Sequence, residues 1–501
     1  LNSQVDGSAR RNLLYSDPLT RDWNRVDAWG YSGQASMHRS NRLLASFGGD
    51  VYDERVASER TVTEASGRVA RPRTLYPDRS RYQNVGVFGQ TSLHLTSRLR
   101  ASSGVRFTGV RFATRKDEAF GIPESSQWFR DFTFQSSLAW QVASAFGIHG
   151  IVSRGFRAPN LNDLGALGLN DLGYEIPASA AIPAGALLSS DAGEGALSKG
   201  KPLGSLSAEK LMNYEFGMRV NSRRGYARVQ LFDAELADPI VRRTLLFPLT
   251  SIPGELAGLP VTPLSPTGGQ QGQGVVTVAT EVDPRAVKAF VNDGRSRYYG
   301  VEGLGHYIIK QRLSVNANYT YILGRELNPN RNIRRLPPQM GAVSLRYIPA
   351  GRRPWLELAV YASGAQDRLS GGDRDDERIG ASFRRSDIAS FFRGSRVGSY
   401  VDPATGVFRP TGETLLEIQN RVLPIGSTMN GVQIADNNSR APFYLSTAGW
   451  ATVSIRSGFP LSERWRLNAA LENLLDRNYR VHGSGIDSPG ISAWVGMGYR
   501  F

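Results

Sequence analysis

The last eleven residues of the chain place an apolar side chain at every second position. These apolar positions are Ile491, Ala493, Val495, Met497, Tyr499 and Phe501. A period of two puts alternate side chains on opposite faces of a β-strand. Because the sequence reaches a terminal aromatic residue without a polar tail, the pattern predicts that it ends inside a sheet. Such an ending is typical of a closed membrane β-barrel, in which the final strand pairs with the first.

The same alternation recurs in two-stranded units, and residues 297–323 form the clearest of them. Tyr299, Val301 and Tyr307 share one predicted face. After a break at Lys310, the positions from Leu313 to Leu323 alternate apolar residues with serine, asparagine and threonine. An apolar face backed by amides and hydroxyls suits a wall between lipid and water, although a soluble β-sandwich produces the same alternation.

The lengths of the connections favour the membrane barrel. The pattern predicts about fifteen strands, near residues 22–33, 40–55, 81–95, 98–114, 129–142, 144–155, 209–221, 225–240, 295–307, 311–324, 338–349, 354–366, 444–457, 463–474 and 490–501. Short turns and long connections alternate between them, and the longest connections span about 57–79, 156–208, 241–294 and 367–443. Compact soluble domains seldom contain several long structureless loops, whereas outer-membrane barrels combine short periplasmic turns with long extracellular loops.

This topology makes a prediction about the N-terminus. If the last strand ends in the periplasm, the short turns are periplasmic and the long loops extracellular. Fifteen is an odd number, whereas bacterial single-chain barrels have even ones. We therefore expect residues 1–21 to be the tail of an extracellular loop, and the barrel to be incomplete at its N-terminus. The sequence starts at Leu1 without a signal peptide, so the signal has been removed or the chain is a piece of a longer protein.

Composition narrows the function classes. The 501 residues include no cysteine, which excludes thiolate metal sites and catalytic thiols, and no run of roughly 18–20 apolar residues that a membrane helix would need. Arginine carries nearly all of the positive charge behind the net +15. The arginines are scattered and accompany no zinc-finger or RNA-binding motif, which argues against nucleic acid. They could instead pair with lipopolysaccharide phosphates or with an anionic ligand.

Five segments, in the expected order, resemble the TonB-dependent outer-membrane receptor family. They are Ser153–Leu161 with its Phe-Arg-Ala-Pro box, the Asn-Tyr-Glu segment at 213–217, the Gly-Val-Glu segment at 296–303, the proline pair at 337–338, and a C-terminal box at 472–485 that is followed by the terminal Tyr-Arg-Phe. The resemblance covers nearly the whole chain and implies the C-terminal two-thirds of a barrel.

The resemblance implies a barrel of 22 strands around a plugged lumen, so about seven strands, the plug domain and the TonB-contacting box would be missing from this chain. It implies an outer-membrane receptor of a Gram-negative bacterium that binds a scarce nutrient, such as a siderophore-type chelate, and imports it with TonB-derived energy. The implied partners are the TonB complex (through the missing N-terminal part), the barrel-assembly machinery, lipopolysaccharide and the nutrient chelate. The ligand itself is not readable from the sequence.

The family-like residues are interpreted as structural rather than ligand-binding. They are Phe156, Arg157, Ala158, Pro159 and Asn160 in the first box, and Asn473, Tyr479 and Arg480 in the C-terminal box. Pro159 would stop the strand ladder, because it has no N–H to donate, and Arg157 could anchor the loop base in a carboxylate network. Tyr499 and Phe501 would form the barrel-assembly signal.

No metal, cofactor or catalytic site is predicted. The histidines, His38, His94, His149, His306 and His482, are dispersed, and residues 157–208 contain none, which counts against haem binding through that loop. The acidic run Asp373, Asp375, Asp376 and Glu377 could bind Ca²⁺, but interleaved arginines favour a self-neutralised, solvated loop. No G-x-S-x-G, H-E-x-x-H or P-loop motif is present, so the chain is not expected to be an enzyme. A passive porin is the main alternative, and a lipid-hydrolysing barrel is a weaker one.

Overall fold

A computed structural model describes residues 2–10, 19–40 and 42–370, apart from residues 65, 75, 119–121, 123, 171–172, 267, 329 and 352. It also describes residues 446–500 and, between them, residues 373, 382–384, 400, 402, 405, 407–422, 424, 427–429, 432–433 and 440–442. The chain divides into two compact units. Unit 1 comprises Leu1–Trp140, Ile151–Tyr214 and Glu235–Arg295, and unit 2 comprises Gln141–Gly150, Glu215–Ala234 and Ser296–Phe501.

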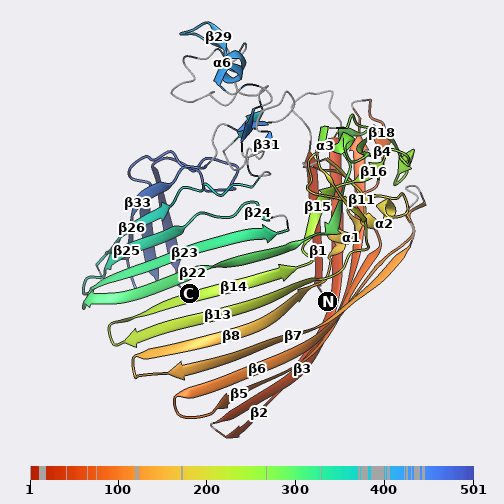
Figure 1. Ribbon diagram of the computed structural model, residues 1–501. Helices are drawn as coiled ribbons and strands as arrows, with labels where there is room; N and C mark the ends of the chain where they lie inside the picture. Colours follow the sequence, from red (N-terminus) through yellow and green to blue (C-terminus); the bar gives the residue numbers. More distant parts are fainter. Residues whose placement is uncertain are drawn as a thin grey trace. The chain divides into compact units, whose positions relative to one another are not determined.

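Long β-strands dominate the structure and form one sheet of 18 strands (Figure 1). They are β1 Asn2–Arg10, β2 Leu19–Ser40, β3 Leu43–Thr63, β4 Val69–Ala70, β5 Ser80–His94, β6 Leu99–Thr114, β7 Ser125–Gln141, β8 Phe146–Arg157, β13 Glu209–Ser222, β14 Gly225–Ala237, β22 Arg295–Lys310, β23 Leu313–Leu327, β24 Asn330–Asn332, β25 Met340–Tyr347, β26 Trp355–Ser363, β33 Trp450–Pro460, β34 Trp465–Glu472 and β35 Ser492–Tyr499. Successive strands pair antiparallel. The β2–β3 ladder, for example, runs from Leu19 opposite Thr63 to Ser40 opposite Leu43. The predicted all-β antiparallel architecture is confirmed.

The N-terminal prediction is wrong in one respect. Residues 2–10 are not a loop tail, because they form β1, which pairs with residues 20–28 of β2. The sequence NSQVDGSAR does not predict a strand, because it is almost entirely polar. Pairing with β2 requires only its backbone N–H and C=O groups. Without the two short strands β4 and β24, the described part of the sheet has sixteen strands, which agrees with the predicted number of about fifteen but is even. The argument from an odd number of strands does not hold.

The two faces of the sheet differ in polarity, as β25 and β26 of unit 2 illustrate. Val343 lies opposite Val360 and Leu345 opposite Leu358, and all four side chains are exposed. On the other face, the buried Glu357 accepts a hydrogen bond from Nε of Arg346 at 2.8 Å. Rows of exposed apolar side chains backed by a polar face are the arrangement of a strand between lipid and water.

Unit 1 has the same polarity. Val105 of β6 lies opposite Phe134 of β7, and the rings of Phe107 and Phe132, the next pair on that face, are 5.0 Å apart between centroids. The intervening residues, among them Arg106, project from the opposite face.

Two of the long connections are folded rather than structureless. The first contains α1 Leu161–Gly165, β9 Gly168–Asn170, β10 Gly173–Glu175, α2 Ala178–Ala181, β11 Leu187–Ser189 and β12 Ser198–Pro202. The second contains β15 Ile240–Thr244, β16 Leu246–Pro248, β17 Glu255–Leu256, β18 Leu259–Pro263, α3 Gly268–Gln271, β19 Val275–Thr280, β20 Asp283–Ala286 and β21 Lys288–Asn292. We call residues 158–208 and 238–294 together the cap, which belongs to unit 1 (Figure 1).

Strands from both connections interleave in the cap. One small sheet has the order β15-β21-β10-β9, and a second joins β11 and β12 to β16–β20. β10 pairs parallel with β21 through Glu175 and Lys288, although more than a hundred residues separate them in the sequence. The cap therefore folds as one body with its own apolar core.

The connection after β26 is described in part. It contains β27 Ser382–Arg384, β28 Val407–Phe408, β29 Glu413–Thr414, α6 Leu415–Val422, β30 Thr428–Met429, β31 Val432–Gln433 and β32 Arg440–Pro442. Among the described residues, no helix is long and apolar enough to cross a membrane.

Candidate ligand site

A pocket of about 470 Å³ lies on the polar face of β5 to β8, in unit 1. Its walls are Tyr82, Asn84, Arg106, Thr108, Val110, Thr133, Arg154, Gly155, Phe156, Arg157 and Ala158. Alternate residues of neighbouring strands supply the polar groups, because the period of two turns them all toward one face. Three residues of the predicted Phe-Arg-Ala-Pro box are therefore in the pocket wall.

Two of the pocket arginines are held by aspartates on the same face. Nη1 and Nη2 of Arg154 donate to the two carboxylate oxygens of Asp131 at 2.6 and 2.7 Å, and Nη1 also donates to the carbonyl oxygen of Phe132. Nη2 of Arg106 lies 2.8 Å from Oδ1 of Asp50. Bidentate pairing fixes the plane of a guanidinium group, so the wall of the pocket is pre-organised.

Arg157, the last residue of β8, bridges two acidic residues. Its Nε and Nη2 donate to the carboxylate of Glu209 at 2.6 and 2.9 Å, and its Nη1 donates to Oδ2 of Asp163 at 2.7 Å. Asp163 and Asn160 form a reciprocal capping box at the start of α1. Oε1 of Glu209 also accepts from the backbone N–H of Ile240, the first residue of β15. The contacts of Arg157 match the anchoring role expected from the sequence, which stays a prediction until a substitution tests it.

The opposite charges around the pocket are paired, with one carboxylate in excess. Three guanidinium groups, those of Arg106, Arg154 and Arg157, face the four carboxylates of Asp50, Asp131, Asp163 and Glu209. A recess of this kind recognises a ligand through oriented hydrogen-bond donors and acceptors rather than through a large positive potential.

The cap packs onto the same face of the sheet, directly beyond the pocket. Val110 and Phe112 continue the face of β6 that carries Arg106, and they are buried in a cluster with Leu164 of α1. Phe290 of β21 packs against the edge of this cluster. The polar face thus becomes apolar where the cap is seated, which attaches the cap to the strands that form the pocket.

Buried ion pairs connect the strands inside the cap. Asp293 accepts from Nε of Arg243 at 2.8 Å and also pairs with Lys199, which joins the two connections. Arg242 pairs with the buried Glu175, and its guanidinium lies 4.9 Å from the ring centroid of Phe290. We expect these pairs to disfavour other strand pairings, because a mispaired arrangement would leave charges buried without partners.

Burial and pairing also shift the protonation equilibria of the cap. Burial lowers the pKa of Lys288, whose Nζ donates to the carbonyl oxygen of Ala286 at 3.0 Å. Hydrogen bonds from Arg285 lower the pKa of Asp283, so this carboxylate stays ionised at neutral pH. Burial raises the pKa of Tyr174, which keeps its phenol neutral.

In unit 2, the predicted C-terminal box organises the connection between β34 and β35. The Asn473 side chain accepts from the N–H of Arg477 at 3.0 Å and donates to the carbonyl oxygens of Arg477 and Pro489. The rings of Tyr479 and Trp450 are 4.3 Å apart, and Arg480 Nε donates to Asp487 at 2.7 Å. The contacts of Asn473 and Arg480 are local to the connection, whereas Tyr479 packs against Trp450 of β33.

The terminal residues are placed only in part. Tyr499 packs its ring 4.7 Å from that of Trp465, and Phe501 lies outside the described residues. The structure thus provides a local packing partner for Tyr499, while the assembly role of Tyr499 and Phe501 stays a prediction.

The histidines occupy separate places. His149 lies over Gly217, where a Cβ would fall within 2.1 Å of the imidazole ring, so glycine is needed for this contact. His306 pairs with Oδ1 of Asn316 at 2.8 Å. His482 contacts Oγ1 of Thr447, and burial lowers its pKa. Within the described ranges, no three His, Cys, Asp or Glu residues are grouped as metal ligands.

The acidic run at 373–377 differs from the solvated loop that was expected, at the one position that the structure describes. Asp373 is buried, and its carboxylate accepts hydrogen bonds from the backbone N–H groups of Arg335 and Ser370 at 2.8 and 3.0 Å. The Asp373 carboxylate therefore links two connections, the one that contains Arg335 and the one that contains Ser370. Asp375, Asp376 and Glu377 lie outside the described residues.

Sequence reasoning missed the pocket residues Arg106 and Arg154 and their aspartates. Arg154 falls inside the quoted family-like segment, but its partner Asp131 is 23 positions away on another strand. The sequence does place charged residues of opposite sign on the polar faces of neighbouring strands. Which of them form pairs can be inferred only when the register of the strands is known.

Comparisons with known proteins agree with this geometry. A family model described as "TonB dependent receptor-like, beta-barrel" matches residues 2–474. No curated protein matches the chain in sequence.

Among solved structures, the copper transporter OprC superposes with a TM-score of 0.61 at 11% identity, over 99% of this chain and 61% of that one. The FrpB iron transporter of Neisseria meningitidis gives 0.55 at 10% identity, over 100% and 62%. The ferric yersiniabactin uptake receptor FyuA of Yersinia pestis gives 0.51 at 14% identity, over 96% and 53%. These likenesses show the fold, and the chain spans between about half and two-thirds of the length of these proteins.

The family comprises outer-membrane transporters rather than enzymes, which confirms the expected location and the expectation of no enzymatic activity. Because the match covers most of the sequence, the chain belongs to the TonB-dependent receptor-like β-barrel family.

Proposed function

We propose that the protein containing this chain is a receptor that captures a scarce nutrient chelate of the siderophore type and imports it with TonB-derived energy. The observation that carries the proposal is the folded cap, seated on the same polar strand face as the pre-organised pocket. A receptor needs binding residues that are held in place by a rigid scaffold, and such residues are commonly supplied by loops. Here the strands of the sheet are the scaffold and the cap is the ordered loop region.

The proposed topology places the cap and the other long connections at the cell surface and the short turns in the periplasm. Energy would come through the TonB complex, by way of a plug and a TonB-contacting segment of the full-length protein. The barrel-assembly machinery and lipopolysaccharide are the further partners. Solved structures whose names describe a copper transporter and a ferric yersiniabactin uptake receptor support a metal or metal-chelate ligand as the class.

A comparison of uptake with and without TonB tests the proposal. Cells that express the full-length gene should accumulate at least one radiolabelled ferric chelate with saturable kinetics, and deletion of TonB should abolish that uptake. A passive porin, the alternative, would give uptake that rises linearly with chelate concentration and is unchanged by the deletion.

The charge of the ligand is examined in the same assay. An arginine-rich receptor is expected to bind anionic chelates with an affinity that falls as salt is raised, because mobile ions screen exposed charges beyond about 10 Å at 0.1 M. The pocket arginines are paired with carboxylates, and so are the three arginines of the cap, Arg242, Arg243 and Arg285, none of which is exposed. The expectation therefore rests on exposed arginines elsewhere on the protein. Equal affinities for neutral and anionic chelates at all salt concentrations would contradict an anionic ligand.

A further inference from the structure

Positive charge gathers at the short turns of unit 2. The β13–β14 turn carries Arg223 and Arg224, and the β22–β23 turn carries Lys310 and Arg312. All four side chains are exposed. A turn needs no such charge for its geometry, since glycine, asparagine and serine suffice.

Three further short connections of unit 2 continue the series, whereas the β7–β8 turn, residues 142–145, carries no charged residue. Arg353 precedes β26, Arg464 and Arg466 border the β33–β34 turn, and Arg500 follows β35; all are exposed. Glu463 is the only carboxylate in the sequence of these turns. We call the eight cations of Arg223, Arg224, Lys310, Arg312, Arg353, Arg464, Arg466 and Arg500 the basic edge.

Backbone contacts bring neighbouring turns together. The N–H of Ile308 donates to the carbonyl oxygen of Arg224 at 2.6 Å, and that of Ile348 donates to Arg312 at 2.8 Å. The N–H of Arg500 donates to Arg464 at 2.8 Å. The cations are therefore arranged along adjoining strand ends of one sheet rather than dispersed over a surface.

Aromatic residues border the basic edge on the apolar face of the strands. Tyr307, Tyr347, Trp465 and Tyr499 all lie within a few residues of a turn, and each is exposed. Amphipathic rings of this kind collect where a membrane meets water. The cations just beyond them are thus at the level of lipid headgroups.

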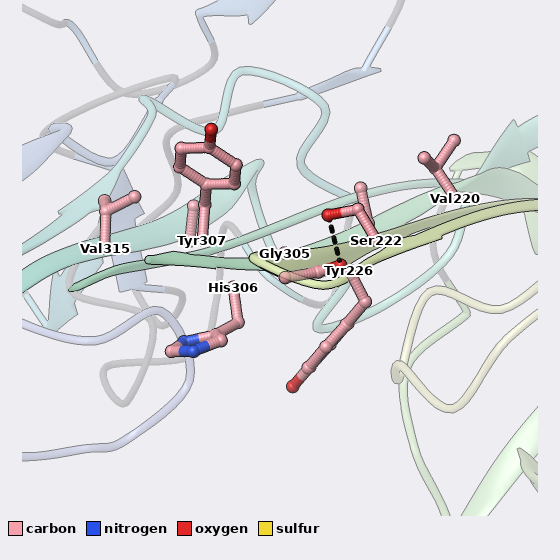
Figure 2. A pocket seen from close by; sticks show the side chains of 10 residues that line it. Val220, Ser222, Tyr226, Gly305, His306, Tyr307 and Val315 are labelled. Carbon is pink, nitrogen blue, oxygen red and sulfur yellow. Dashed lines mark hydrogen bonds between the residues drawn. The ribbon is translucent and has the colours of Figure 1, made fainter. Parts of the chain in front are cut away.

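An apolar groove of about 320 Å³ opens beside the first two turns (Figure 2). Val220, Tyr307 and Val315 project from one face of the sheet around it, whereas His306 and Tyr226 project from the other face (Figure 2). The groove exists because Gly305, Ala227 and Gly225 have little or no side chain on its floor. Ser222 and Gly225, which flank Arg223 and Arg224 in the sequence, are both in its lining.

We propose that the basic edge and this groove form a binding site for an anionic glycerophospholipid, such as phosphatidylglycerol, of the leaflet at the short-turn side. The phosphate would lie among Arg223, Arg224, Lys310 and Arg312, and an acyl chain would occupy the groove. Charge complementarity selects the headgroup, because juxtamembrane cations attract anionic lipids. The inference requires only that the sheet spans the membrane, and it does not depend on which nutrient is imported.

Native mass spectrometry of the purified chain tests the site. The chain is reconstituted in nanodiscs of equal parts phosphatidylglycerol and phosphatidylcholine, released in mild detergent, and its retained lipids are counted. Phosphatidylglycerol should be retained in preference to phosphatidylcholine. Replacing Arg223, Arg224, Lys310 and Arg312 together by Gln should reduce that preference at least about tenfold, on the order expected for losing several surface cations.

Two further variants separate the site from general effects. A control in which four exposed arginines away from the short turns, Arg325, Arg334, Arg409 and Arg477, are changed to Gln should keep the preference. Gly305→Leu should fill the groove and lower lipid retention without removing charge, since a Cβ at this position meets its neighbours at ordinary distances of 3.5 Å or more. Heat-dependent gel mobility verifies that each variant is folded.

Three outcomes would overturn the proposal. They are equal retention of both lipids by the unmodified chain, a phosphatidylglycerol preference that survives in the folded four-site variant, and an equal loss of preference in the control variant.

Discussion

Replacing Phe247 by Ala is expected to unfold the cap while leaving the strands of the large sheet intact. Phe247 lies in β16 with 0% of its surface exposed, in the centre of the cap core. Truncating a buried phenylalanine to alanine removes apolar burial and leaves a cavity, at a cost of about 3–5 kcal/mol. The cap is small and divided among short strands, so this is a large share of its stability.

Amide hydrogen exchange measures the effect, because it reports the opening of each segment separately. Residues 275–292 of the cap should lose protection in Phe247→Ala, whereas β5 and β6 keep theirs. Leu249→Ala is the matched control, since Leu249 is two positions along the chain and 48% exposed. Equal loss of protection in cap and sheet would show that the cap is not a separate folding unit.

Replacing Arg157 by Ala is expected to destabilise the attachment of the cap by about 2 kcal/mol. The substitution leaves the carboxylates of Glu209 and Asp163 without their guanidinium partner, and hydrogen bonds to charged groups contribute roughly 1.5–3 kcal/mol each. Because 42% of the Arg157 side chain is exposed, solvent screening keeps the loss below the roughly 3–5 kcal/mol of a fully buried pair.

A double-mutant cycle measured by urea unfolding in detergent micelles tests the contribution of Arg157. Glu209→Gln in the Arg157→Ala background should cost less than Glu209→Gln alone, because the partner is already lost. Arg295→Ala, which breaks the exposed pair with Glu235, is the control and should cost no more than about 1 kcal/mol. Additive effects of the two site substitutions would contradict an anchoring role for Arg157.

The strands of the sheet were predictable where one face is apolar. In β23, the alternation from Leu313 onward predicted both the strand and which of its residues lie on the apolar face. The short connection that follows predicted its antiparallel pairing with β25. The signal is physical, because exposure of every second side chain to lipid requires that those positions be apolar.

Two parts of the fold left no alternating pattern. β1 contains only two apolar residues, Val5 and Ala9, so its sequence marks no apolar face. β19, Val275–Thr280, is buried at every position, so it reads as a continuous apolar run rather than as an alternation. Such a run can be recognised as a strand, but its partner strand cannot be predicted. Alternation alone therefore predicts a loop where the cap is folded.

The candidate site was predictable only in its residue types. Arg157 was expected to meet carboxylates, but Glu209 is 52 positions away and reaches it because β8 and β13 end side by side in the sheet. Besides the local pair of Arg157 with Asp163, the charge pairing around the pocket depends on three contacts between residues 23 to 56 positions apart. No local pattern encodes them.

The side of the membrane on which the cap lies is the most direct test of a capture function. These 501 residues contain no cysteine, so a cysteine introduced among them is the only thiol of this part of the protein: Leu249→Cys in the cap, and Gln311→Cys in the exposed β22–β23 turn. Cells expressing the full-length gene with each change are treated with a maleimide that cannot cross the outer membrane. We predict that Leu249→Cys is labelled in intact cells and Gln311→Cys only after permeabilisation. Labelling of Gln311→Cys in intact cells, with Leu249→Cys protected, would place the cap in the periplasm and contradict its role in capturing a nutrient at the cell surface.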